Sequence, residues 1–283
     1  MNYVFLAVVI LLCAFQNIAK KHYITKSKYH NNFTFSFITT FTAMIFFVLK
    51  SGFEFEFNAE FIPYSIAFAV SYGMSMAGGV LAIKYGSFSL TSLIVNYSLL
   101  IPTFYGIFVY NDPVKFAGYA GFLLLCVSLF MINEKDNVKK KVTFKWILSL
   151  FVAFIGSGCC SLFQKMQQVA FSGKYKSEFM IVALVLCSVG LLVAAIIKRE
   201  KNMSDLKHSL PMGILSGAAN GIVNYLVMVL TATVPSAILF PSISAGSIAI
   251  TFVAGIFVYK EKFINTQYIG YALGVISLVL LNL

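Results

Sequence analysis

Amide side chains recur at helical spacing inside stretches of sequence that are otherwise apolar. Gln16 and Asn17 lie in the first such stretch, and Gln164 lies in a later one with a similar pattern. Asn220 and Asn224 are one helical turn apart and therefore share a helix face. An amide among apolar groups needs hydrogen-bond partners, so these residues indicate binding of a small polar solute rather than covalent chemistry.

The candidate binding residues are these five amides and the neighbours that we expect to face them. The full set is Gln16, Asn17, Tyr72, Met76, Asn96, Gln164, Lys165, Asn220, Asn224 and Tyr225. The alternative interpretation is that polar side chains only join helices, at about 0.6 kcal/mol per contact. We favour that alternative for the serines, whereas two asparagines one turn apart are costly to satisfy by packing alone.

Lys165 has two interpretations. It follows Lys145 by 20 residues, which is about 30 Å along a helix, so its side chain is expected to extend into the far membrane interface. The alternative is that it gates the cavity or anchors a substrate carboxylate. Lys20 has the same two interpretations, and the interfacial one is stronger there because Lys21 follows it.

No acidic residue is expected inside an apolar stretch. The ten acids are Glu54, Glu56, Glu60, Asp112, Glu134, Asp136, Glu178, Glu200, Asp205 and Glu261. Carboxylate-based proton antiport is therefore not expected, and a neutral, zwitterionic or anionic solute fits better than a cation. Cationic solutes remain open, because aromatic side chains can bind them. No nucleophile–base set or metal-ligand pattern is present, so neither an enzyme nor a cofactor is expected.

The composition excludes a soluble globular protein. The chain has 283 residues, of which 59% are hydrophobic and 11% charged, whereas typical soluble chains are about a quarter charged. The five cysteines lie in apolar runs and do not indicate a disulfide scaffold. We interpret the net charge of +11 as a marker of membrane orientation rather than of nucleic-acid binding.

Apolar runs of about 20 residues predict transmembrane helices. Ten such spans are predicted, at 2–20, 33–50, 62–83, 87–110, 114–132, 145–168, 177–197, 209–231, 235–259 and 265–283. Short polar or basic segments separate them and leave no room for a soluble domain. The predicted fold class is therefore an all-α membrane protein.

The chain also contains an internal repeat. The segment from Gly106 to Tyr110 recurs as Gly255 to Tyr259, and Phe15-Gln16 recurs as Phe163-Gln164. The repeat divides the ten transmembrane helices into two five-helix units, residues 1–141 and 142–283. Because each unit has an odd number of spans, the two repeats are predicted to be inverted, as in secondary transporters with a midplane substrate site. The less favoured alternative is a duplication that only builds a stable bundle.

These features together resemble the drug/metabolite transporter superfamily, EamA-like branch. The residues that carry the resemblance are Gly255 to Glu261 with Gln267, Gly270 and Gly274, their partners Gly106 to Asp112 with Gly121, and Lys20. The resemblance implies a central cavity walled by spans 1–4 and 6–9, with spans 5 and 10 at the periphery. We interpret Asp112 and Glu261 as acids that start a helix or as markers of the family loop.

The distribution of basic residues predicts an orientation. Sixteen of the 21 basic residues fall in loops after odd-numbered spans. The positive-inside rule then places these loops in the cytoplasm and both termini outside. The EamA-like family is usually described with both termini inside, so the two arguments disagree.

The function predicted from the sequence is transport of a small polar organic metabolite, such as an amino acid, by alternating access. Alternatives are a flippase or transporter of a lipid-linked or choline-like substrate, and an uptake transporter of a sugar or vitamin. A membrane enzyme and a non-transporting receptor are disfavoured. The expected partners are the small-molecule substrate and the lipid bilayer of a bacterial plasma membrane, without nucleic acid. A monomer suffices for a pathway, and a dimer is compatible with it.

Overall fold

The computed structural model describes residues 2–26, 31–85, 91, 94–112, 116–132, 143–200, 203–257 and 264–281. These residues are helical almost throughout, and no strand occurs among them. Each helix satisfies most of its backbone hydrogen bonds internally, which a lipid surrounding requires. The all-α class expected from the sequence is confirmed for this part of the chain.

Five of the described helices are long and apolar enough to cross a membrane. They are α1 (Asn2–Lys26), α2 (Asn32–Lys50), α7 (Phe144–Ala170), α8 (Lys176–Ile197) and α9 (Met203–Thr231), of which Asn2–Lys20 of α1 and Leu210–Thr231 of α9 are the qualifying parts.

The structure describes further helices beside these five. They are η1 (Ala59–Phe61), α3 (Ile62–Tyr85), η2 (Tyr97–Leu99), α5 (Leu100–Val109), α6 (Phe116–Ile132), α10 (Ser236–Phe257) and α11 (Asn265–Leu281). Large apolar side chains cover the outside of the bundle, among them Phe116, Phe151 and Ile197, each more than 60% exposed. Such a surface is expected where lipid rather than water surrounds the protein.

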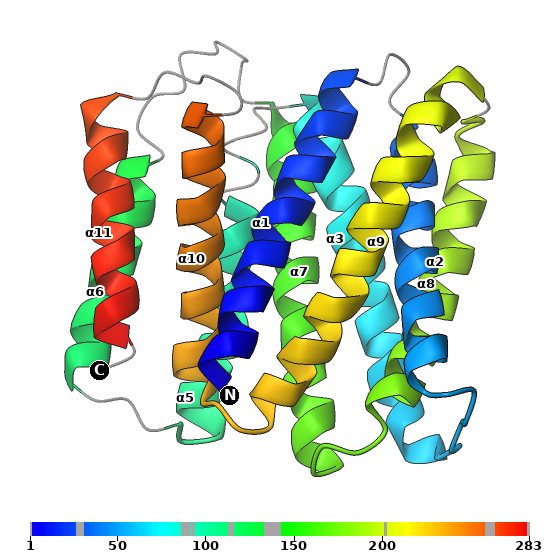
Figure 1. Ribbon diagram of the computed structural model, residues 1–283, viewed down its shortest axis with the longest axis horizontal. Coiled ribbons are helices and arrows are strands. Elements are labelled where there is room, and N and C mark those ends of the chain that lie inside the picture. Colours follow the sequence, from blue (N-terminus) through cyan, green and yellow to red (C-terminus); the bar gives the residue numbers. More distant parts are fainter. Residues whose placement is uncertain are drawn as a thin grey trace.

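The described helices form two layers that stand side by side (Figure 1). In one layer α11, α10, α1, α9 and α2 follow one another, and in the other α5, α7, α3 and α8 do. Across the layers α6 packs on α11, α5 on α10 and α2 on α8. Helix α1 begins and α11 ends at the lower edge of the bundle as drawn.

The segment 87–110, predicted as one span, is not a uniform helix where the structure describes it. A 3-10 turn at Tyr97–Leu99 precedes α5. Pro102 has no N–H, so it cannot continue the α-helical hydrogen bonding toward Ser98. The proline therefore interrupts the regular helix near its middle. Residues 86–90, 92 and 93 lie outside the described part.

Helices α3 and α7 approach until their backbones touch. A Cβ atom added at Gly78 would lie 2.6 Å from the Ala153 nitrogen and 2.8 Å from the Ser149 carbonyl oxygen. One added at Gly156 would lie 2.5 Å from the Ser75 nitrogen. No larger residue fits either position without moving a backbone, so the two glycines fix the separation of this pair.

Two acids bind the first turns of helices from the opposite half of the chain. The Glu200 carboxylate accepts hydrogen bonds from the Thr34 N–H at 2.8 Å and the Phe33 N–H at 3.3 Å, at the start of α2. Asp112 accepts one from the Ser236 N–H at 2.6 Å, at the start of α10. The expectation that Asp112 starts a helix is thus refined, because its helix is α10 and not the one that follows it. Glu261 lies outside the described residues.

Candidate binding cavity

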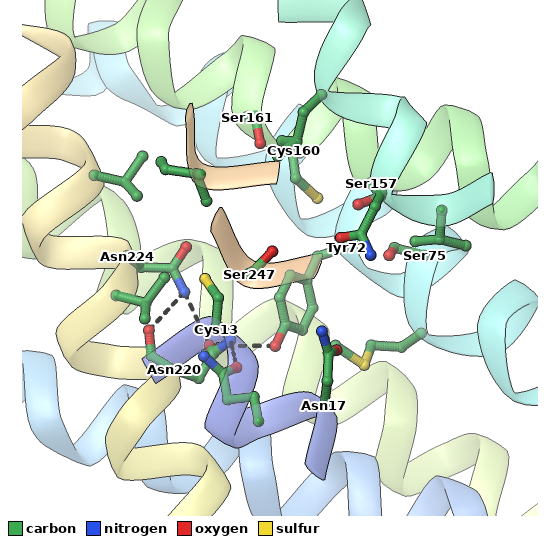
Figure 2. Close-up of a pocket in the computed structure, with 18 of the residues that line it drawn as sticks. Cys13, Asn17, Tyr72, Ser75, Ser157, Cys160, Ser161, Asn220, Asn224 and Ser247 are labelled. Carbon is green, nitrogen blue, oxygen red and sulfur yellow. Dashed lines mark hydrogen bonds between the residues drawn. The ribbon is translucent and has the colours of Figure 1, made fainter. Parts of the chain in front are cut away.

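A cavity of about 300 Å³ lies between α1, α2, α3, α7, α9 and α10 (Figure 2). Eight of the ten residues predicted from the sequence line it: Gln16, Asn17, Tyr72, Met76, Asn96, Gln164, Asn220 and Asn224. They come from α1, α3, α7 and α9 and from the segment before η2. The structure therefore brings together polar side chains that are up to 208 residues apart in sequence.

Four amide side chains form a continuous hydrogen-bonded row along one wall. Gln164 Nε2 donates to Asn224 Oδ1 at 2.6 Å, and Asn224 Nδ2 donates to Asn220 Oδ1 at 2.9 Å. Asn220 Nδ2 donates to Gln16 Oε1 at 2.9 Å. The row thus joins α7, α9 and α1. Within it Asn224 and Asn220 each use a donor and an acceptor, Gln164 only donates and Gln16 only accepts, which leaves other donors and acceptors for a solute.

Two further contacts orient this row. Asn224 Nδ2 also donates to the Asn220 backbone oxygen at 2.9 Å, and Tyr72 Oη donates to Asn220 Oδ1 at 3.4 Å. The Phe68 ring stacks on Tyr72, with centroids 5.7 Å apart, and both residues line the cavity. Hydrogen bonds of this kind polarise one another in a low-dielectric site, so the row acts as one unit.

The remaining lining adds hydroxyls, sulfur and one charge. Its other polar members are Cys13, Lys20, Ser36, Thr39, Ser75, Ser157, Cys160, Ser161, Ser216 and Ser247. The ammonium group of Lys20 is the only charged group that the described lining contains. Such a surface can bind and orient a polar solute, and it holds no set of three metal-ligating side chains within the described residues.

Lys165 and Tyr225, predicted as binding residues, do not line the cavity. Each directly follows a lining residue, Gln164 or Asn224, and one step along a helix turns a side chain by about 100°. Tyr225 instead packs against the apolar core between α2 and α8, and the Lys50 ammonium lies 5.1 Å from its ring centre. The structure therefore does not place these two residues beside the other predicted binding residues.

Lys165 is bound at the end of α9, outside the cavity lining. Its Nζ donates to the Thr231 carbonyl oxygen at 2.8 Å, at the end of α9, and lies 5.8 Å from the centre of the Tyr110 ring. The side chain is buried, with 7% of its surface exposed. It therefore does not extend into the membrane interface, and the C-terminal carbonyls of α9 provide its partner.

Two lining residues of α2, Ser36 and Thr39, are absent from the predicted set. With Thr40 they form a hydroxyl pattern at i, i+3 and i+4 within a phenylalanine-rich helix. That pattern marks a polar face and could have identified α2 as a wall of the cavity. Lys20 is also missing from the set, because it was expected at a span end. Helix α1 in fact continues to Lys26, which keeps Lys20 inside the helix.

Comparisons with known proteins identify the fold alone. The sequence matches no protein-family model and no curated protein. Its structure is similar to a crystal structure described only as that of a protein, with a TM-score of 0.78 and 11% sequence identity. The likeness covers 99% of this chain and 95% of the other. The two chains therefore share one architecture over their whole length.

Proposed function

We propose that the protein is a membrane transporter of a small polar organic metabolite and works by alternating access around the amide-lined cavity. The observation that carries this proposal is a row of hydrogen-bonded amides beside a 300 Å³ cavity, inside a bundle with an apolar exterior. Amide groups are costly in an apolar interior, and a solute that binds them repays that cost. A purely structural bundle gains more from apolar packing at the same positions.

A cluster of apolar side chains next to the cavity supports one closed end. Val9, Leu230 and Leu239 are buried together there, with Phe240 and Ile243 on the side of the cavity. Lys165 ties α7 to the end of α9 in the same region. In an alternating-access cycle this end would have to separate while the opposite end packs together.

Contacts between equivalent positions support two inverted repeats. Phe15-Gln16 recurs as Phe163-Gln164, an offset of 148 residues. One hydrogen bond, from Tyr72 to Asn220, joins residues separated by this same interval. Another, from Ser244 to the Asn96 carbonyl oxygen, is one position away from the equivalence that relates Gly106 to Gly255. Residues next to a two-fold axis contact their own equivalents, so these bonds fit an axis through the cavity.

The pairing of helices fits the same axis. In the repeat, α1 corresponds to α7, α2 to α8 and α3 to α9. The contacting pair α1 and α9 therefore has the pair α7 and α3 as its counterpart, and the pair α2 and α9 has the pair α8 and α3. In the pairs α2 with α8, α5 with α10 and α6 with α11, the two contacting helices are each other's counterparts. On this basis we propose ten spans in two inverted five-helix units and membership of the drug/metabolite transporter superfamily.

A binding screen followed by a flux measurement tests the proposed function. The purified protein is screened by thermal shift against amino acids, sugars, nucleosides and amines, because a ligand above its Kd raises the unfolding temperature. Solutes that bind are then offered to proteoliposomes. We expect saturable uptake that the Asn224→Leu variant loses, because that change removes a central member of the amide row.

The matched control is Ser188→Ala on α8. Ser188 is buried and its hydroxyl has no hydrogen-bond partner within the described residues, but it does not line the cavity. This variant should bind and transport like the unaltered protein. Folded protein that moves none of the solutes would contradict the proposal, and scrambling of headgroup-labelled lipid without solute uptake would favour a flippase.

A further inference from the structure

The charges around the cavity are unbalanced. Among the described lining residues one is cationic, Lys20, and none carries a carboxylate. Two described acids, Asp112 and Glu200, already bind backbone amides at the starts of α10 and α2. An ammonium group without an opposite charge in an apolar bundle is unfavourable, and a bound anion removes that cost.

Lys20 is held in place by its helix. It lies on the same face of α1 as Cys13, Gln16 and Asn17, which also line the cavity. Helix α1 continues beyond it to Lys26, so its backbone belongs to a regular helix rather than to a frayed end. Its Nζ is 3.8 Å from the position that a Cβ would take at Gly79. The absence of a side chain at Gly79 leaves space beside the ammonium group.

The two lysines near the cavity differ in what they bind. Lys165 donates to the Thr231 carbonyl oxygen, whereas Lys20 has no hydrogen-bond or ion-pair partner in the described part of the chain. The buried hydroxyl of Thr39, which lines the same cavity from α2, also has no partner within that part. Two unpartnered polar groups therefore face one cavity that also contains unused amide donors.

We propose that the solute is a small monocarboxylate and that Lys20 binds its carboxylate. This inference rests on the proposed transport function and names its substrate class. One ammonium compensates one negative charge, while phosphates and dicarboxylates usually require arginine or several cations, and no arginine lines the described cavity. A volume of 300 Å³ accommodates about ten non-hydrogen atoms, at about 30 Å³ for a water-sized group.

The amide row binds the other end of the molecule. Gln16 and Asn17 are one turn from Lys20 on α1, and Asn220 continues the row on α9. Hydroxyl, keto or amide substituents of the acid can hydrogen-bond there, and the Phe68 and Tyr72 rings provide an apolar surface beside it. A charged end and a polar uncharged end are thereby recognised by different helices.

The test compares acids with their primary amides, which have nearly the same shape but no charge. The panel contains monocarboxylates of up to about ten non-hydrogen atoms, including lactate and phenylacetate, each with its amide. Thermal shift and uptake are measured with the purified, reconstituted full-length protein. We expect acids to bind at least tenfold more tightly than their amides. Lys20→Gln should remove this preference and Lys20→Arg should keep part of it.

Lys26→Gln is the matched control, because Lys26 is exposed at the end of the same helix and does not line the cavity. It should leave acid binding unchanged. Equal responses to acids and amides, stronger binding of inorganic phosphate or succinate, or unchanged acid binding in folded Lys20→Gln would each overturn the inference. Uptake of amides but not of acids would contradict the substrate class and leave the proposed transport function intact. Acid binding that depends on Lys20 but is not followed by uptake would contradict only the transport function.

Discussion

Two helix pairs border the cavity, and they are held together differently. Helices α3 and α7 meet backbone to backbone at Gly78 and Gly156. Helices α1 and α9 meet through side chains, by the Asn220 to Gln16 hydrogen bond and by the apolar cluster that contains Val9. The glycines of α9 do not serve this pair, because Gly217 and its neighbours contact α2.

The difference indicates which pair can move. The backbone contacts at Gly78 and Gly156 leave no space between the two helices, so α3 and α7 should behave as one rigid body. Side-chain contacts can be exchanged for contacts with a solute, so α1 and α9 are the pair that should separate. With the offset of 148 residues between the two repeats, the position equivalent to Gly78 is Leu226 and the position equivalent to Gly156 is Val8. The pair α1 and α9 therefore cannot copy the close approach of its counterpart.

The largest effect is expected from Gly156→Leu. The added side chain would collide with the backbone at Ser75, where even a Cβ atom would be 2.5 Å from the nitrogen. Overpacking against a backbone that cannot yield should cost about 3 kcal/mol. Thermal unfolding in detergent, followed by intrinsic fluorescence, measures the loss. An unchanged unfolding temperature would refute the rigid pairing of α3 and α7.

Gly190→Ala is the control for that change. Gly190 lies in α8, and a Cβ added there would meet nothing within 4 Å. The alanine should preserve or slightly raise stability, because glycine inside a helix costs about 1 kcal/mol relative to alanine.

A somewhat smaller effect is expected from Lys165→Met, which cuts the link between the two pairs. The change leaves the Thr231 carbonyl oxygen without its donor. Loss of a buried hydrogen bond to a charged group should cost about 2 kcal/mol. Chemical denaturation measures it, with Lys174→Met at an exposed loop position as the control. Equal effects of the two substitutions would mean that Lys165 does not stabilise this end.

Asn220→Leu should weaken the contact between α1 and α9 and leave the contact between α3 and α7 unchanged. Gln16 Oε1 and Tyr72 Oη lose their partner in the row, but the adjoining cavity can admit water. The stability cost should therefore be about 1.5 kcal/mol, with Ser216→Ala, also in the cavity wall of α9, as the control. A cost as large as that of Gly156→Leu would show that the two pairs are equally rigid.

The smallest effect is expected from Asp112→Ala. The first turn of α10 loses an acceptor for the Ser236 N–H, and helix caps of this kind contribute about 1 kcal/mol. Since α10 packs on α1, the change should loosen the α1 side of the cavity and spare α3 and α7. Hydrogen exchange resolved by helix measures this, with Glu54→Ala as the control. Faster exchange in α3 would contradict the separation of the two sides.

The sequence predicts most of the cavity because its chemistry is periodic. Gln16 and Asn17 stand out as adjacent amides in one apolar helix, and Asn220 and Asn224 as amides one turn apart in another. All four line the cavity. The same periodicity cannot show how a helix is rotated against its neighbours. Tyr225 therefore lies against the core and not in the cavity lining, since one position along α9 decides between the two.

Other features depend on contacts that no local pattern encodes. The interruption before α5 follows from Pro102, although a proline in an apolar run can also kink a helix without ending it. The partner of Lys165 is a backbone oxygen of Thr231, and any residue type could supply that atom. Tertiary packing decides these cases, and the pairing of loop acids with distant helices belongs to the same class.

Glu200 links two segments that leave the ribosome at different times. The Thr34 N–H that it accepts from is 166 residues earlier in the chain. At a translation rate of about 5 to 20 residues per second, the first turn of α2 waits roughly ten to thirty seconds for this carboxylate. During that interval water or lipid headgroups must bind its amides. The start of α2 is therefore completed late in biosynthesis, after α8 has been synthesised.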